Sequence, residues 1–160
     1  MSEVVLLSDV GADYTKLRAL LVASQWKEAD EETGRIMLDI ADREKEGYLD
    51  SDAIKKFPCT DLRTLDELWV GYSKGQFGFS VQRRIYEEVG KDFTKMCDRI
   101  GWRQAGNWLN YSSLIFDTNA PLGHLPGGGW IGSFSGLGGI GVMSSWWYSY
   151  LASRLEKCNI

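Results

Sequence analysis

The chain has 160 residues, a net charge of −4 and a sequence pI near 5.1, so it lacks the strongly basic balance that broad binding to nucleic-acid phosphates requires. Hydrophobic residues make up 44% and charged residues 25%, as in ordinary soluble domains, and no apolar run of about 18 residues predicts a membrane-spanning helix. The first residues carry acids where a secretory signal would carry positive charge. A single domain is expected.

The first part of the chain predicts two helices after a short lead-in. Residues 1–12 are expected to be flexible, and residues 13–160 to form one helical domain. Asp13 can cap a helix that reaches about Ser24. A longer amphipathic helix is predicted from Trp26 to Gly47, where glycine ends it. The short gap between them favours an antiparallel pair, and a short helical turn is expected at 52–56.

The rest of the chain is organised around the stretch from Phe57 to Arg84, which reads FPCTDLRTLDELWVGYSKGQFGFSVQRR. Thr64 and Glu67 have the spacing of a capping box, which predicts a helix start there, and Ser80 is placed to cap the next helix. The stretch holds rings, glycines and turns but no pair that suggests an acid, a base or a nucleophile. It therefore suits a large, flat, apolar ligand better than bond chemistry.

The second half of the chain predicts two or three further helices and a loop. An apolar stripe over residues 81–100 predicts helix, with a kink or a break at Gly90. Residues 101–113 are expected to form a compact irregular segment or a short helix. The Gly-rich stretch 119–141 predicts a long apolar loop, suited to a lid or a ligand wall, before a last helix from about Ser144 or Ser145. The fold class is all-α.

The chemistry-bearing side chains leave few options for catalysis. The three cysteines form an odd, widely spaced set that matches neither a zinc site nor a disulfide pattern, so reduced thiols are expected. They are Cys59, Cys97 and Cys158. His124 is the only histidine; it is either a loop residue hydrogen-bonded to backbone or an axial ligand to the metal of a macrocycle.

The seven tryptophans are the strongest hint of a ligand. Trp26 and Trp69 lie on apolar helical stripes and are expected in the core. Three others lie in Gly-containing sequence, where pocket and core are equally good interpretations: Trp102, Trp108 and Trp130.

Several long segments resemble one known family, the genomes-uncoupled-four family of tetrapyrrole-binding regulators of magnesium chelatase. The segments are LRALLVASQWKEADEETGRIML, FPCTDLRTLDELWVGYSKGQFGFSVQRRIY, RIGWRQAGNWLNY, APLGHLP and SFSGLGG. Together they run from about Tyr14 to Gly139, most of the chain.

The resemblance implies a compact helical bundle with a cupped apolar cleft walled by two long loops, here Gly47 to Phe57 and Asn119 to Phe134. It implies a non-enzymatic, monomeric protein that binds protoporphyrin IX, magnesium protoporphyrin IX or a bilin. It also implies stimulation of magnesium chelatase through that enzyme's large porphyrin-binding subunit. The expected location is the cytoplasm of a cyanobacterium, or the chloroplast stroma or a membrane surface in a eukaryote; peripheral membrane association is left open.

The chain departs from the family pattern where the ligand's carboxylates should bind. Family members usually carry arginine in or after the APxGHLP loop, whereas this chain has Leu122 and then three glycines, with no Lys or Arg between Asn119 and Leu151. Propionates favour cationic partners, so that role would move to Arg99, Arg103, Lys55 or Lys56. The segment before Arg99 is also shorter than in chelatase activators, and the N-terminal helical region of many cyanobacterial members is missing.

These considerations give a set of candidate ligand contacts. The candidate wall residues are Leu49, Val70, Phe79, Trp102, Leu122, Leu125 and Trp130. Arg99 and Arg103 are candidates for the carboxylates, and His124 for the metal side. Replacing Trp102 with alanine is expected to weaken porphyrin binding with little change in helicity. Two alternatives stay open: a bilin- or tetrapyrrole-binding carrier or sensor without a chelatase role, and an enzyme that acts on the tetrapyrrole itself.

Overall fold

The computed structural model describes residues 3–127 and 141–160, and this part of the chain is helical apart from one small hairpin. The helices are α1 (Thr15–Val22), α2 (Trp26–Ala41), α3 (Ser51–Lys55), α4 (Cys59–Tyr72), α5 (Phe79–Glu88), α6 (Phe93–Ile100) and α7 (Gly141–Lys157). The antiparallel strands β1 (Arg103–Gln104) and β2 (Asn107–Trp108) precede a 3-10 turn, η1 (Tyr111–Ser113). The prediction of an all-α fold is confirmed.

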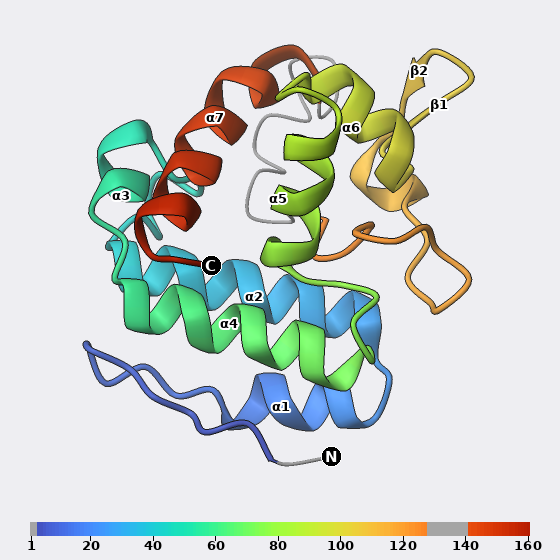
Figure 1. The fold of residues 1–160 in the computed structure, drawn as a ribbon. Helices are drawn as coiled ribbons and strands as arrows, with labels where there is room; N and C mark the ends of the chain where they lie inside the picture. The colour runs from blue at the N-terminus through green and yellow to red at the C-terminus, as the bar shows by residue number, and fades with distance from the viewer. Residues whose placement is uncertain (1–2, 128–140) are drawn as a thin grey trace.

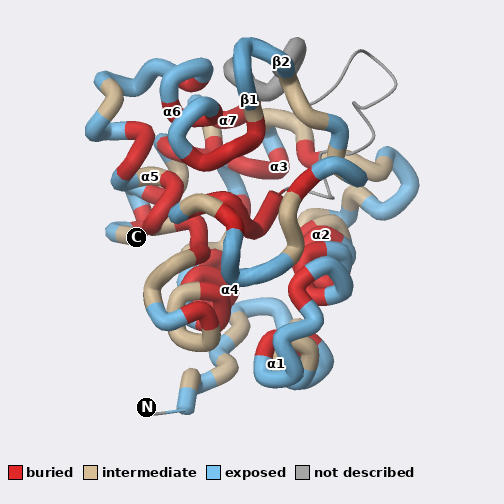
Figure 2. The backbone as a smooth tube through the Cα atoms, turned by 90° about the vertical axis from the view of Figure 1, so that its right-hand side faces the viewer, coloured by how far each residue is buried: buried red, intermediate tan, exposed pale blue. Residues whose placement is uncertain are grey.

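The helices form stacked layers (Figure 1). Helices α2 and α4 cross the middle of the molecule, with α1 and the N-terminal segment on one side and α5, α6 and α7 on the other. Helix α3 packs against α7. Buried residues lie where the layers face one another, and exposed residues lie on the outer turns (Figure 2). None of the described helices is both long and apolar enough to cross a membrane.

An aromatic cluster fixes the middle layer. The ring of Trp26 lies 6.1 Å from that of Trp69 and 5.4 Å from that of Phe77, measured between centroids. The indole N–H of Trp69 donates a hydrogen bond of 2.9 Å to the Thr33 hydroxyl, which joins α4 to α2 inside the core. Both tryptophans are buried, so the prediction that they belong to the core is confirmed.

Helix α4 begins earlier than predicted. It starts at Cys59, directly after Pro58, whose φ of −61° and ψ of 130° are extended. Thr64 therefore lies within the helix, and its hydroxyl donates to the carbonyl of Leu7 instead of capping. The capping box was the wrong start signal here, because a proline-led turn already brings the chain into the helix.

The start of α5 was also assigned to the wrong residue. The helix begins at Phe79, and its cap comes from a different helix: the Asp66 carboxylate of α4 accepts the amide N–H of Ser80 at 2.8 Å. Gly78 precedes the helix at φ 134°, and a Cβ there would lie 2.6 Å from Val70 and 2.9 Å from the Asp66 carboxylate. Only glycine lets α4 and this turn approach so closely.

Three other helix boundaries in the structure make the predicted ones more exact. Helix α2 ends at Ala41, well before Gly47, because Asp42 adopts a left-handed conformation with φ 55°. Of the two alternatives at Gly90, the structure shows a break, since α5 ends at Glu88 and α6 starts at Phe93. The last helix begins at Gly141, somewhat before the predicted serines.

The described part of the N-terminal lead-in makes hydrogen bonds to α4. The buried Asp61 carboxylate accepts hydrogen bonds from the Ser8 hydroxyl, the Asp9 amide N–H and the Tyr14 hydroxyl. Ser8 and Asp9 are therefore held against α4, while the flexibility expected of residues 1–12 stays a prediction. Burial and the Asp61 charge raise the pKa of the Tyr14 phenol.

The cysteines contradict the expectation of reduced thiols. Cys59 and Cys158 form a disulfide with a Cα–Cα distance of 5.3 Å, whereas Cys97 is a buried free thiol. The bond closes a large loop, because its ends are 99 residues apart in the sequence. Spacing alone did not indicate it, since the two residues meet only after α7 has folded back onto the start of α4.

Candidate functional site

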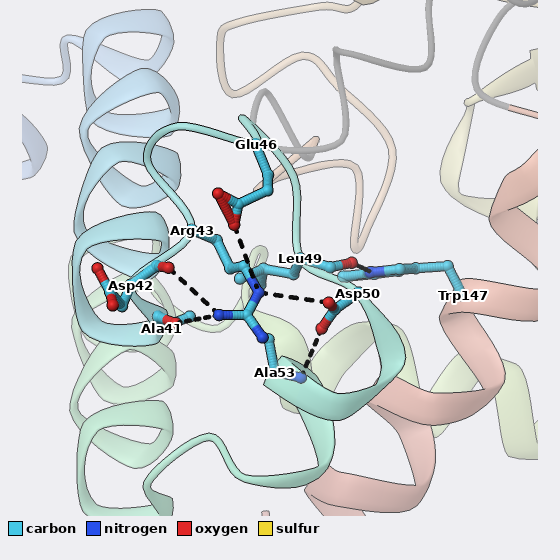
Figure 3. Close-up of polar contacts among 8 residues, drawn as sticks. All are labelled: Ala41, Asp42, Arg43, Glu46, Leu49, Asp50, Ala53 and Trp147. Carbon is cyan, nitrogen blue, oxygen red and sulfur yellow. Dashed lines mark hydrogen bonds and ion pairs between the residues drawn. The ribbon is translucent and has the colours of Figure 1, made fainter.

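The loop between α2 and α3 is held in shape by Arg43 (Figure 3). The guanidinium donates to the Asp50 carboxylate at 3.3 Å and to the carbonyls of Ala41 and Asp42 at 3.3 and 3.2 Å. Glu46 lies 3.8 Å from the same guanidinium. The other oxygen of Asp50 accepts the Ala53 N–H and caps α3, and this hydrogen bond, with help from Arg43, lowers the pKa of Asp50. The conformation of this loop is therefore fixed by its own side-chain hydrogen bonds.

The same loop is joined to α7 by one buried tryptophan. The indole N–H of Trp147 donates to the Leu49 carbonyl at 2.8 Å, as Figure 3 shows. Both residues are almost fully buried. Because an unpaired buried carbonyl is destabilising, this bond ties the position of the loop to that of α7.

Replacing Trp147 with phenylalanine is expected to lower the free energy of unfolding by about 1–3 kcal/mol, since Leu49 loses its buried donor. Hydrogen exchange should quicken at Leu49 and Asp50 in this variant. The Trp69→Phe variant is the matched control, because it removes an indole N–H bond to Thr33, away from the loop. Equal loop protection in wild type and Trp147→Phe would contradict the proposed attachment.

The segment after the hairpin presents a row of half-buried apolar side chains, which we call the aromatic ridge. It consists of Trp108, Leu109, Tyr111, Ile115 and Phe116. The rings of Tyr111 and Phe116 meet edge to face with centroids 5.4 Å apart. Ligand sites are lined mainly by hydrophobic and aromatic side chains, so the aromatic ridge has the composition of one such wall.

The aromatic ridge is fastened to helices at two of its members, Tyr111 and Trp108. The hydroxyl of Tyr111 donates to the buried Asp30 carboxylate of α2 at 2.8 Å, and the Gly127 N–H donates to the other oxygen at 3.0 Å. Burial and the Asp30 charge raise the pKa of Tyr111. Trp108 stacks on Phe93 of α6 with centroids 6.0 Å apart and planes 15° from parallel.

These contacts close into a circuit, which we call the contact ring. It runs from Asp30 of α2 to Tyr111, along the aromatic ridge to Trp108, and on to Phe93. From there Phe93 lies 5.6 Å from Tyr148 of α7, and the neighbouring Trp147 returns to the α2–α3 loop. The contact ring thus reaches the loop 47–57 through Leu49, and its Asp30 also accepts the Gly127 N–H of the loop 119–134, of which the structure describes residues 119–127.

Arg103 is the candidate cation nearest to the aromatic ridge. Its guanidinium carbon lies 5.6 Å from the centre of the Trp108 ring, and one terminal nitrogen donates to Asp98 at 3.0 and 3.1 Å. Its Nε is buried without a hydrogen-bond partner. Arg99, in contrast, pairs with Glu88 at 2.9 Å on the surface, with more than half of its side chain exposed. Arg103 is thus the better placed of the two.

Most candidate wall residues lie inside the core. The side chains exposed by 2% or less are Leu49, Phe79, Trp102 and Leu125. They pack in the core beneath the surface, and in this conformation a ligand could not contact them. In particular, Trp102 donates its indole N–H to the His124 carbonyl at 2.8 Å, so replacing it with alanine would also remove a buried donor; its effect on porphyrin binding and helicity stays a prediction.

The remaining wall candidates lie apart from the contact ring. Val70 borders a surface depression beside Val4 and Ser80, and Leu122, with 46% of its surface exposed, borders another beside Trp26. Trp130 lies outside the described residues. A role of these side chains in binding stays a prediction.

His124 is built into the backbone network. Its Nε2 accepts the Ile115 amide N–H at 2.9 Å, so Nδ1 carries the proton and donates to the Ile100 carbonyl at 2.6 Å. The residue is fully buried, and burial lowers its pKa although the Ile100 hydrogen bond opposes the shift. Of the two interpretations drawn from the sequence, the geometry matches the backbone-bonded histidine; a metal at Nε2 would have to displace the Ile115 N–H.

The lowered pKa of His124 predicts acid-sensitive stability. The unfolded chain binds this proton below pH 6.5 and the folded chain only at lower pH, so this contribution is complete above pH 6.5 and is lost as the pH falls. The free energy of unfolding should fall by up to about 1.4 kcal/mol per pH unit between the two pKa values. Urea unfolding is measured at several pH values from 7.5 to 5. The free energy of unfolding should depend less steeply on pH for His124→Gln than for wild type. The same pH dependence in both proteins would contradict the assignment.

The residues of the contact ring were largely missed by the sequence interpretation. For Trp108 the sequence leaves pocket and core equally open, and for Phe93 it indicates only a place in the helical stripe 81–100. The available signal was the sequence GNWLNYSSLIF, in which large apolar residues alternate with Gly, Asn and Ser instead of following a helical or strand period.

Comparison with other sequences shows relatives in oxygenic phototrophs. The Ycf53-like protein of Synechocystis sp. (strain ATCC 27184 / PCC 6803 / Kazusa) is 38% identical over 124 residues, which cover 76% of this chain and 53% of that protein. The chloroplastic tetrapyrrole-binding protein of Arabidopsis thaliana is 35% identical over 118 residues, which cover 66% of this chain and 44% of that protein. The chain thus spans about half the length of these relatives.

Solved structures show the same fold. The structure of GUN4 from Chlamydomonas reinhardtii matches with a TM-score of 0.76 at 28% identity, covering 96% of this chain and 93% of that one. Ligand-free GUN4 from Arabidopsis thaliana matches with a TM-score of 0.69 at 29% identity, covering 89% and 92%. The family description GUN4-like matches residues 7–136. The chain therefore belongs to the GUN4-like family.

Proposed function

We propose that this chain is a non-catalytic tetrapyrrole-binding protein whose ligand lies against the aromatic ridge, within the contact ring. The observation that carries the proposal is the half-buried aromatic ridge itself, fastened to α2 by Tyr111 and to α6 by Trp108. Membership of the GUN4-like family and a relative named as a tetrapyrrole-binding protein support it. We propose protoporphyrin IX and magnesium protoporphyrin IX as the ligands.

The expected binding energy comes from apolar contact. Removing a few hundred Å² of macrocycle and protein surface from water would contribute several kcal/mol at about 25 cal/mol per Å². Ordering of the ligand and of side chains reduces this gain, which leaves affinities around the micromolar range.

We further propose that the bound protein stimulates magnesium chelatase through the enzyme's large porphyrin-binding subunit. The relatives in a cyanobacterium and in a chloroplast support a role in the cytoplasm of the former or the stroma of the latter. A carrier or sensor of bilins without a chelatase role is the second candidate. The observation that favours a role without the chelatase is the absence of Lys and Arg from residues 104–153, because the family resemblance implies arginine in or after the APLGHLP loop.

An enzymatic role is less well supported by the candidate groups. Both ring nitrogens of His124 are engaged by backbone, and Cys59 and Cys158 are joined to each other. Burial raises the pKa of the Cys97 thiol well above its usual range, which disfavours the reactive thiolate. These groups are therefore poor proton donors or nucleophiles in this conformation.

The proposal is tested by titrating the protein with protoporphyrin IX, magnesium protoporphyrin IX and biliverdin while following tryptophan fluorescence and pigment absorption. Saturable porphyrin binding, tighter for the magnesium form, is the expected result. Binding of biliverdin alone would favour the sensor. Absence of binding to all three would contradict the proposal. A chelatase assay with and without the protein then separates a regulator from a carrier.

Replacing Arg103 with glutamine is expected to weaken porphyrin binding about 5-fold, because a charge-assisted hydrogen bond at a partly exposed site contributes about 1 kcal/mol. Arg99→Gln is the matched control and should bind almost as well as wild type, since Arg99 lies on the surface beside Glu88. The two variants are compared by the same fluorescence titration. Equal affinities in both would remove Arg103 from the site.

A further inference from the structure

The end of α7 is bound to the start of α4 by a covalent bond and two hydrogen bonds. Cys158, which follows α7 directly, forms the disulfide with Cys59, the first residue of α4. The Arg63 guanidinium donates to the Cys158 carbonyl, and Arg154 Nε donates to the Phe57 carbonyl at 2.8 Å. The disulfide is the one covalent member of this set.

Helix α7 also connects this attachment to the contact ring. Trp147, in the first half of α7, holds the Leu49 carbonyl of the α2–α3 loop. Further along, Lys55 of α3 lies 4.9 Å above the ring of Tyr150. A rigid helix therefore runs from the α2–α3 loop to the disulfide, so the freedom of its C-terminal end affects the loop.

Of the two bonded cysteines, Cys59 lies in the setting that better favours exchange. Cys59 is partly exposed, whereas Cys158 is buried. As the first residue of α4, Cys59 lies at the positive end of the helix dipole, which stabilises a thiolate. The nearest carboxylate in the first turn, Asp61, is occupied by its three hydrogen-bond donors, and the cation of Arg63 lies one turn further on.

We propose that the Cys59–Cys158 disulfide is a redox switch that fastens α7 and thereby sets the tetrapyrrole affinity of the contact ring. The inference rests on the proposed function, whose site it regulates. The oxidised protein holds α7 and the α2–α3 loop together and binds tightly. The reduced protein frees the end of α7, loosens the loop and binds more weakly.

The reaction is thiol–disulfide exchange with a dithiol. One thiolate of the dithiol attacks Cys59 Sγ, the S–S bond breaks, and Cys158 leaves as a thiolate that takes up a proton. The second thiolate of the dithiol then attacks the dithiol's first sulfur, which is bonded to Cys59 Sγ in the mixed disulfide. Cys59 leaves as a thiolate that the start of α4 stabilises. Two electrons pass to the protein, and the dithiol becomes a disulfide; oxidation reverses these steps.

The test compares oxidised protein with protein reduced by dithiothreitol and alkylated, the thiols being counted by mass spectrometry. Hydrogen exchange should quicken over residues 43–57 and 147–158 on reduction, and the dissociation constant for magnesium protoporphyrin IX should rise about 5-fold or more. The Cys59→Ser/Cys158→Ser variant should resemble the reduced protein and should not respond to dithiothreitol. The reduced wild type serves alone if that variant does not fold.

The outcomes separate this inference from the proposed function. Faster exchange in both segments together with weaker binding supports the switch. Unchanged exchange at residues 43–57 after full reduction overturns it, whatever the ligand does. If neither redox form binds any tetrapyrrole, the proposed function fails, and the switch of tetrapyrrole affinity fails with it even where exchange quickens.

Discussion

Replacing Cys59 and Cys158 together with serine is expected to lower the free energy of unfolding by about 3–5 kcal/mol. The two residues are 99 positions apart, so the bond restricts a large part of the unfolded chain. For a loop of about 100 residues, the chain-entropy estimate is about 4.7 kcal/mol at 25 °C. Because a domain is usually stable by only about 5–15 kcal/mol, this one bond would account for a large share of the total.

The measurement is denaturant unfolding of the oxidised wild type, the reduced wild type and the double serine variant. The last two should have nearly the same midpoint, well below that of the oxidised protein. A midpoint for the double variant equal to that of the oxidised protein would show that the bond contributes nothing. In a different outcome, an unchanged free energy of unfolding with an altered denaturant slope would indicate a change in the surface exposed on unfolding.

The helical layers could be predicted from the sequence because amphipathic periodicity reports directly which side of a helix is buried. Trp26 and Trp69 were assigned to the core on that basis, and both are there. The ends of helices were harder, because several are set by contacts that are remote in sequence. The cap of α5 is Asp66, fourteen residues before its partner Ser80, so no local capping pattern could have identified it.

The candidate site could be predicted only in outline. The family resemblance indicated two loops, and the structure shows that α7 contacts the first through Trp147. The individual side chains could not be predicted. Trp102 and Leu125 are apolar, as residues of a pocket wall usually are, but core residues are apolar too. Burial is decided by tertiary packing, and a sequence without period, such as the aromatic ridge, carries no signal for which side faces solvent.

Replacing Trp108 with alanine is expected to weaken the binding of magnesium protoporphyrin IX about 10-fold or more with little loss of stability. The ring is half-buried and stacks on Phe93, so it offers a flat apolar surface that a macrocycle can extend. Aromatic stacking contributes about 0.5–1.5 kcal/mol beyond burial, and loss of the contact area adds to this. The measurement is the fluorescence and absorption titration, with circular dichroism as the check on folding.

Two comparisons make this result decisive. Trp108→Phe keeps a stacking ring and should recover much of the affinity, which would show that an aromatic face and not the indole N–H is needed. Trp102→Ala is unsuitable as the diagnostic variant, since it removes a buried ring and the donor to the His124 carbonyl, and its weaker binding would report unfolding as well as contact loss. Unchanged affinity in a folded Trp108→Ala protein would place the ligand elsewhere than on the aromatic ridge. In that case Arg103, which lies over the same ring, would lose its assigned role too, because the two positions share one surface.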